Sequence, residues 1–246
     1  MKKEIKLFAF DLDGTLYLGS KIIKDTMELV KYLQGKYQVV FHTNGSVKTS
    51  LEVWEKLNDM GFECKENEVY TSSSLTAMYL YENDINNVYV IGSDSFKNEI
   101  EKNGIVIVDH WSADNVVVGM TSQFNYDHVA NALHIIEKGG KFITCNEDGK
   151  YPISSKSSLP GCGALVGSIV YASSKRPDHI VGKPNSYLLE KICQDFSVTN
   201  KQIVVIGDSW KSDIDMANDF GCHSILVKEF NTSKQVMEFE KEMMNE

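Results

Sequence analysis

Short apolar runs alternate with amphipathic segments along most of the chain. An apolar run that stops at turn-forming residues is typical of a buried strand, and apolar residues three or four positions apart are typical of a helix. Strands are expected at residues 5–10, 37–42, 69–71, 179–181, 202–206 and 224–227. Helices are expected at residues 23–35, 47–60, 74–82 and 185–196. This alternation predicts a doubly wound α/β fold, in which a parallel sheet is built by right-handed crossovers.

The helical pattern is clearest in residues 47–60. The positions on its apolar face are Val47, Leu51, Trp54 and Leu57, and Gly61 follows as the C-cap. At the other end of the chain, residues 232–246 are rich in Met and Glu and are expected to form a surface helix.

The stretch between residues 71 and 179 repeats the alternation on its own. Strands are expected there at 88–91, 105–108, 116–118 and 142–145, and helices at 95–103, 126–138 and 162–173. These elements are enough for a separate α/β layer. We therefore expect residues 80–179 to form an inserted domain and residues 1–79 and 180–246 to form the core domain. The alternative is one domain with a longer sheet.

Two carboxylates, Asp11 and Asp13, stand where the first apolar run stops. Ligands of open α/β sheets bind at the carboxyl ends of the strands, so this position favours a site. Two unit charges about 4 Å apart repel by roughly 4 kcal/mol at an effective dielectric constant of 20. A bound cation or a proton on one carboxylate would relieve that repulsion.

Three further expected strands also end in polar residues. Thr43-Asn44-Gly45-Ser46 follows the second run, Lys183 follows residues 179–181, and Asp208 and Asp213 follow residues 202–206. Each strand thus delivers polar groups to a loop. Carboxylates, a hydroxyl, an amide and one cation together suit a divalent metal and a phosphoryl group.

These four segments, DLDGTLYLG, TNGS, GKP and GDxxxSDI, resemble the motifs of the haloacid dehalogenase superfamily and follow one another in the same order. Residues 149–152 and 159–165 resemble cap motifs of its NagD-like branch, which carries an inserted type IIA cap. The resemblance implies a Rossmann-like core with an α/β cap. It also implies a Mg²⁺-dependent phosphatase for small phosphomonoesters, such as nucleotide monophosphates or sugar phosphates, that works through an aspartyl-phosphate.

The resemblance further implies a role for each matching residue. Asp11 is the nucleophile, and Asp13 is the general acid and base. Mg²⁺ is held by Asp11, Asp208 and the main-chain carbonyl of Asp13, and Asp213 orients metal-bound water. The phosphate is bound by Thr43, Lys183 and the backbone N–H groups around Asn44 and Gly45.

Several alternatives stay open at this stage. Thr43 and Asp213 are also good helix caps, and an isolated Lys183 would ordinarily be a solvated surface residue. Whether Cys162 or His42 touches the substrate is open, although a structural role is favoured for both. The Gly-rich segments 147–149 and 161–163 are expected to be turns that face the core, where the cap reads the leaving group. The alternative function is that of a phosphate-binding regulatory protein without turnover. Such a protein would be expected to have lost one of four charged residues, which are Asp11, Asp13, Lys183 and Asp208.

The composition of the chain limits the classes of molecule that it is expected to bind. The 246 residues carry a net charge of −9 without a basic cluster, which argues against nucleic acid. The five scattered cysteines show no CxxC spacing, which favours reduced thiols over disulfides or a zinc site. No run approaches the roughly 20 apolar residues of a membrane span, and acids interrupt the first run too early for a signal peptide. We expect a cytoplasmic protein whose partners are a small phosphorylated metabolite and, through the cap, a second copy in a homodimer.

Overall fold

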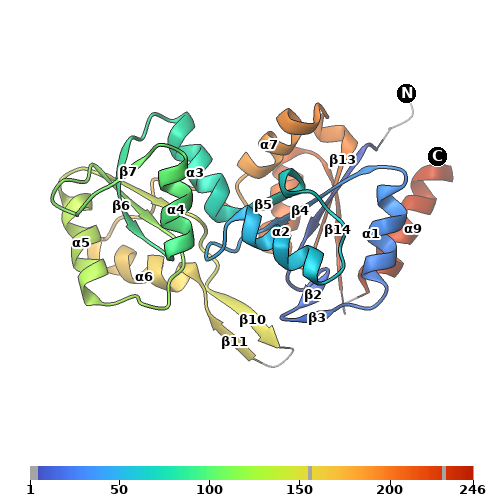
Figure 1. Cartoon of the computed structure of the whole chain (residues 1–246), viewed down its shortest axis with the longest axis horizontal. Helices are drawn as coiled ribbons and strands as arrows, with labels where there is room; N and C mark the ends of the chain where they lie inside the picture. The colour runs from blue at the N-terminus through green and yellow to red at the C-terminus, as the bar shows by residue number, and fades with distance from the viewer. Residues whose placement is uncertain (1–4, 155–156, 229–230, 246) are drawn as a thin grey trace.

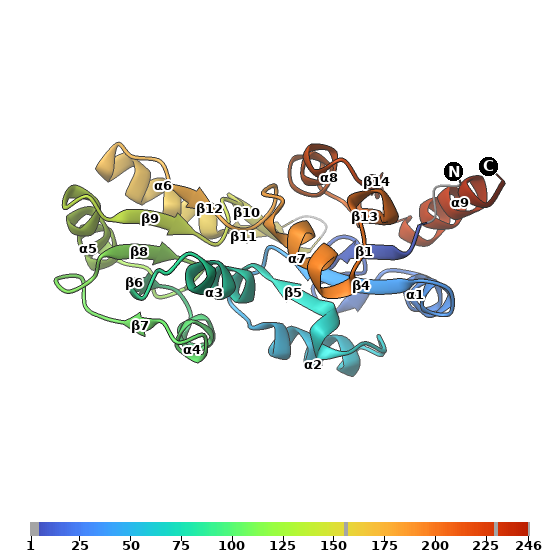
Figure 2. The same ribbon diagram turned by 90° about the horizontal axis from the view of Figure 1, so that it is seen from above.

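Two parallel sheets, each flanked by helices, lie side by side (Figures 1 and 2). The computed structural model describes residues 5–154, 157–228 and 231–245. The first sheet has the strand order β14-β13-β1-β4-β5, and the second has the order β12-β9-β8-β6-β7. Every pairing within the two sheets is parallel. The predicted doubly wound α/β fold is confirmed, and the alternative of a single longer sheet is wrong.

The first sheet is covered by helices on both faces. Its strands are β1 (Leu7–Asp11), β4 (Gln38–Thr43), β5 (Val69–Thr71), β13 (Ile203–Gly207) and β14 (His223–Leu226). Its helices are α1 (Thr26–Gln34), α2 (Ser50–Asp59), α7 (Tyr187–Phe196), α8 (Asp215–Phe220) and α9 (Thr232–Asn245). Successive residues of a strand point to opposite faces, so Leu7 packs with the α7 side and Phe8 with the α1 and α2 side. Burial on both faces explains why these strands are continuous apolar runs.

The second sheet is built in the same way. Its strands are β6 (Asn87–Ile91), β7 (Val106–Ile107), β8 (Asn115–Val118), β9 (Lys141–Thr144) and β12 (His179–Ile180). Its helices are α3 (Ser72–Glu82), α4 (Asp94–Lys102), α5 (Tyr126–Glu137) and α6 (Cys162–Ser173). One face packs on α5 and α6, and the other packs on α3 and α4 in a buried cluster that continues into the first sheet. The domain boundaries at residues 79/80 and 179/180 remain a proposal.

Strand β12 belongs to the second sheet, although the sequence suggested a core strand leading to Lys183. It pairs with β9 through His179↔Ile143 and Ile180↔Thr144. The hydrogen bonding then continues, since Gly182 N–H donates to the Cys145 carbonyl oxygen over 2.7 Å. The loop with Lys183 therefore enters the core from the edge of the second sheet.

Helix α2 begins three residues later than the apolar pattern suggested. Thr49 caps it, and Glu52 completes a capping box. Val47 precedes the helix and is 46% exposed, and Leu51 is 37% exposed, so their predicted place on the buried face is wrong. Its buried residues are Val53 and Leu57.

Helix α9 has a buried face, so the expected surface helix is only partly correct. Val236 is fully buried in the core cluster on the α1 side. The carboxylate of Glu240, which is 2% exposed, accepts hydrogen bonds from Tyr32 and Tyr37 and pairs with Lys36 at 3.0 Å. The helix thus covers an edge of the core.

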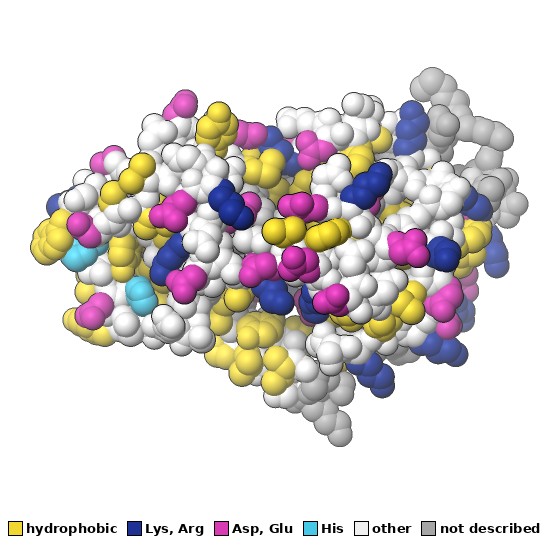
Figure 3. Space-filling view, viewed as in Figure 1, with side chains coloured by type: hydrophobic (Ala, Val, Ile, Leu, Met, Phe, Trp, Pro, Cys, Tyr) yellow, Lys and Arg dark blue, Asp and Glu magenta, His cyan; other side chains and the backbone are white. Residues whose placement is uncertain are grey.

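Two short hairpins, absent from the sequence prediction, lie at the bottom of Figure 1, below the sheets. They are β2–β3 (Tyr17–Leu18 and Lys21–Ile22) and β10–β11 (Lys150–Ser154 and Ser157–Pro160). Strand β10 contacts β2. Tyr151, Ile153 and Leu159 of the second hairpin are exposed. Hydrophobic side chains gather at the bottom of Figure 3, in the region where Figure 1 draws this hairpin. No helix in the described part of the chain is long and apolar enough to span a membrane.

Candidate active site

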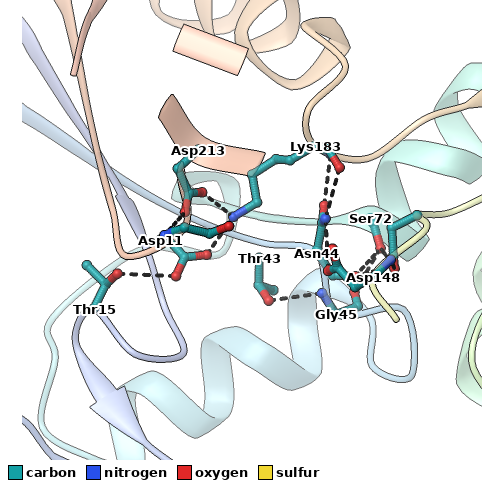
Figure 4. A network of polar contacts seen from close by, with 11 residues as sticks. Asp11, Thr15, Thr43, Asn44, Gly45, Ser72, Asp148, Lys183 and Asp213 are labelled. Atoms are coloured by element: carbon teal, nitrogen blue, oxygen red, sulfur yellow. Dashed lines mark hydrogen bonds and ion pairs between the residues drawn. The ribbon is translucent and has the colours of Figure 1, made fainter. Parts of the chain in front are cut away.

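An ion-paired triad lies at the carboxyl end of the first sheet. Asp11 ends β1, and the Lys183 Nζ atom donates to its Oδ1 atom and to Asp213 Oδ1, each over 2.6 Å (Figure 4). All three residues are buried, with 6%, 4% and 1% of their surface exposed. Lys183 is therefore no solvated surface residue. Asp213 is no cap of α8 either, since its second oxygen accepts from Ser209 N–H.

The triad carries an excess of negative charge. Burial raises the pKa of Asp11 well above its ordinary value, Lys183 opposes this, and Asp213 and Asp208 add to it. Burial alone would lower the pKa of Lys183, but Asp11 and Asp213 outweigh it and hold the lysine protonated. Burial and the charge of Asp213 raise the pKa of Asp208 to about 6. Three carboxylates around one ammonium are the surroundings that a divalent cation would neutralise.

Two glycines bring these acids close together. Gly14 has φ +87°, and a Cβ atom on it would lie 2.1 Å from Asp208 Oδ2. Its N–H donates to the Tyr17 carbonyl oxygen over 2.7 Å, which closes the turn that carries Asp13. A Cβ on Gly207 would lie 2.2 Å from the carboxyl carbon of Asp213. Only glycine leaves room for either carboxylate.

Asp13 has a cationic neighbour that the sequence prediction missed. Burial raises the pKa of Asp13, and the charge of Lys56 is the largest effect that opposes it. Lys56 projects from α2, and its Nζ atom lies 3.7 Å from the centre of the Tyr17 ring. The signal in the sequence was its place on a helix that follows the Thr43 loop.

Thr43 ends β4, and its Oγ1 atom accepts from Gly45 N–H over 3.0 Å. Because Thr49 caps α2, the capping alternative for Thr43 is wrong. The side chain of Asn44 pairs with the backbone of Lys183: Oδ1 accepts from its N–H over 2.8 Å, and Nδ2 donates to its carbonyl oxygen over 3.1 Å. The same Nδ2 atom donates to Asp148 Oδ2 over 3.0 Å. The side-chain amide of Asn44 is thus already hydrogen-bonded to Lys183 and Asp148.

His42 and Cys162 are both buried. His42 lies opposite Asp11 in the β1–β4 register, and burial lowers its pKa, so its ring is neutral. Its ligand atom and those of Asp11 and Asp213 lie within 4.8 Å of one another. Cys162 begins α6, its Sγ atom lies 3.7 Å from the Val118 carbonyl oxygen, and burial raises its pKa to about 11.

Comparisons with known proteins agree with this geometry. The family model described as haloacid dehalogenase-like hydrolase matches residues 8–106, and the one described as HAD-hydrolase-like matches residues 180–243. The acid sugar phosphatase of Staphylococcus saprophyticus is 31% identical over 96% of this chain and 91% of its own length. That of Staphylococcus aureus is 31% identical over 92% of this chain and 87% of its own.

Solved structures give the same result. The 4-nitrophenylphosphatase of Thermotoga maritima has a TM-score of 0.86 and 28% identity, over 92% of this chain and 87% of its own. NagD from E. coli K-12 has a TM-score of 0.83 and 27% identity, over 91% and 88% of the two chains. The similarity thus extends over both sheets and the residues between them. The chain belongs to the haloacid dehalogenase superfamily of hydrolases and, within it, to the NagD-like phosphatases with a type IIA cap.

Proposed function

We propose that this phosphatase depends on Mg²⁺ and hydrolyses small phosphomonoesters through an aspartyl-phosphate on Asp11. The observation that carries the proposal is the buried contact of Asp11 with Lys183 beside two further acids. Lys183 favours the ionised form of Asp11 against the effect of burial, and an ionised carboxylate attacks phosphorus without a base. A lysine bonded to that carboxylate stands where it would also meet the phosphoryl oxygens.

The two half-reactions use Asp13 in opposite directions. In the first, an Asp11 oxygen bonds to phosphorus while the ester P–O bond breaks, and Asp13 gives its proton to the leaving oxygen. In the second, Asp13 takes a proton from a water that attacks phosphorus. The bond from phosphorus to Asp11 then breaks, which releases inorganic phosphate. The raised pKa of Asp13 suits a group that must hold a proton at the start.

Thr43 and the backbone of residues 44 and 45 complete the phosphate site in this proposal. Thr43 lies at the end of β4, next to the strand that carries Asp11. Because the Asn44 side chain is engaged by Lys183 and Asp148, we assign phosphate binding at Asn44 to its backbone N–H group. The Gly45 N–H group donates to Thr43 Oγ1, so in this proposal it holds the Thr43 hydroxyl and turns to the phosphate when the ester binds. Lys183 supplies the fixed positive charge.

The residues present fit a magnesium ion. Their donors are carboxylate oxygens, which Mg²⁺ prefers, and their charge exceeds that of the one ammonium among them. We propose that Asp11, Asp208 and the main-chain carbonyl of Asp13 hold the ion and that Asp213 orients its water. The group of Asp11, His42 and Asp213 is less suitable, because the Lys183 ammonium already binds both of its carboxylates. When bound, the ion would withdraw negative charge from the phosphoryl oxygens.

For the substrate we propose small phosphate esters, with sugar phosphates and nucleotide monophosphates as the first candidates. The names of the relatives, acid sugar phosphatase and 4-nitrophenylphosphatase, support this class. We also propose that residues 80–179 act as the cap that reads the leaving group. A cytoplasmic location and a homodimer through the cap belong to the same proposal.

The test is the release of inorganic phosphate from an aryl phosphate and a panel of sugar and nucleoside monophosphates. We expect turnover with Mg²⁺, none in EDTA, and recovery when Mg²⁺ but not Ca²⁺ is added back, since Ca²⁺ takes a larger and looser shell of ligands. Full activity in EDTA would contradict the metal assignment. Phosphate binding without turnover of any ester would instead favour a regulatory protein.

A further inference from the structure

The turn at residues 146–148 is joined to the catalytic loops through Asn44. Asp148 Oδ2 accepts from Asn44 Nδ2 over 3.0 Å (Figure 4). Asn146 Nδ2 donates to the Asn44 carbonyl oxygen over 2.6 Å, and Asn146 Oδ1 accepts from Asp148 N–H over 3.0 Å. Asn146 is 2% exposed. The turn at residues 146–148, which follows a strand of the second sheet, thus forms hydrogen bonds to both the backbone and the side chain of Asn44.

Asn44 in turn fixes the backbone of Lys183. Its amide makes two hydrogen bonds to the Lys183 main chain, 2.8 and 3.1 Å long. Gly182 permits this approach, because a Cβ there would lie 2.6 Å from Asn44 Oδ1 and 2.5 Å from the Cys145 carbonyl oxygen. The Lys183 side chain then reaches Asp11 at 2.6 Å. The contacts run without a gap from the turn to the nucleophile.

The glycine-rich segment at residues 161–163 packs directly against the backbone of this turn. A Cβ on Gly161 would lie 2.2 Å from the Asp148 carbonyl oxygen, and one on Gly163 would lie 2.3 Å from that of Glu147. Gly163 N–H donates to the Asp148 carbonyl oxygen over 2.9 Å. The segment is the first turn of α6, not a loop that faces the core, and its glycines let α6 lie directly against the turn.

We propose that Asn146 and Asp148 are positioning residues that hold Lys183 in place through Asn44. The inference rests on the proposed function, in which Lys183 binds the phosphoryl group. Lys183 binds the phosphoryl group, which all substrates share. Removal of the Asp148 side chain would therefore lower kcat/KM by the same factor for every ester. A direct contact of Asp148 with the leaving group would instead give losses that differ from ester to ester.

The experiment compares Asp148→Ala and Asp148→Asn with Glu147→Ala. The control lies in the same turn, but its side chain pairs with the exposed Arg176 at 3.7 Å. For each folded variant, kcat and KM are measured on an aryl phosphate and a sugar phosphate, with inhibition by inorganic phosphate. We expect Asp148→Ala to lower kcat/KM about tenfold on both esters and to weaken phosphate inhibition, since a charged hydrogen bond is lost. Asp148→Asn keeps an acceptor oxygen and should recover most activity, and Glu147→Ala should match the wild type.

Three results would overturn the inference: Asp148→Ala that behaves like Glu147→Ala, Asp148→Asn that is as impaired as Asp148→Ala, or a loss confined to one ester. If Asp148→Ala does not fold, Asn146→Asp decides, because it removes the Nδ2 donor to the Asn44 carbonyl oxygen and to Ser72 Oγ and keeps the Oδ1 acceptor for Asp148 N–H. Asn146→Asp should then weaken inhibition by inorganic phosphate, whereas Asp148→Asn should not. Equal inhibition of these two variants by phosphate would contradict the inference. A wild type that releases no phosphate would refute the proposed function itself.

Discussion

Replacing Gly14 by alanine tests whether the turn after β1 sets the position of Asp208. The added Cβ would lie 2.1 Å from Asp208 Oδ2, whereas ordinary van der Waals contacts of a Cβ begin at 3.4 Å. The carboxylate or the turn must therefore move by about 1 Å, and a misplacement of that size costs roughly 100-fold in rate. The backbone adds strain, since φ is +87° and a left-handed conformation costs an L-residue about 1–2 kcal/mol.

Gly139→Ala is the matched control. Gly139 has φ +90°, and a Cβ there would meet nothing within 4 Å. Gly139→Ala should lose about 1–2 kcal/mol in the free energy of unfolding, measured by urea denaturation, and Gly14→Ala should lose at least as much, because its Cβ also meets Asp208. Only Gly14→Ala should also lose kcat/KM on an aryl phosphate by about 100-fold and need more Mg²⁺ for half-maximal activity. Equal kcat/KM values in the two variants would refute the argument that Gly14 exists to admit Asp208.

Two further predictions concern the cap and the last helix. Gly163→Ala should lower kcat/KM by a similar factor on all esters, because the new Cβ meets the turn of Asp148, while Gly167→Ala in the same helix meets nothing within 4 Å and should be neutral. A selective loss on one ester would contradict this. Val236→Ala should reduce the free energy of unfolding by about 2 kcal/mol, since a fully buried side chain is truncated, and Lys234→Ala should change it little. Equal urea midpoints for these two variants would show that α9 contributes nothing to the core.

The residues that could be predicted from the sequence are those delivered by strand ends. Asp11 and Thr43 end β1 and β4, and Asp208 follows β13, so an apolar run followed by a polar residue was sufficient to find them. Lys183 was found by the same logic although its strand pairs elsewhere. Their chemical roles remain proposals, because a strand end places a side chain without showing what it does.

The contacts around Asn44 could not be predicted, because they depend on tertiary geometry. Asp148 lies 104 positions from Asn44 in sequence and has no periodic or motif signal that links the two. Strand β12 has two residues, too few to reveal which sheet it joins. The buried face of α9 was hidden by its charged residues, of which Glu240 is buried in a hydrogen-bonded network. Local patterns specify elements, whereas these contacts arise only when the elements pack together.

The measurement closest to the central claim is to trap the phosphoryl group on Asp11. Wild type and Asp11→Asn are mixed with an aryl phosphate and Mg²⁺ and quenched in acid, and the peptides are examined by mass spectrometry while phosphate release is followed in parallel. We predict a phosphoryl group on the wild-type peptide that contains Asp11, and neither label nor turnover in a folded Asp11→Asn. Asp11→Asn turnover within about tenfold of wild type, which is a barrier change of only about 1.4 kcal/mol, would contradict the account once deamidation is excluded. A label on a different residue would contradict it as well.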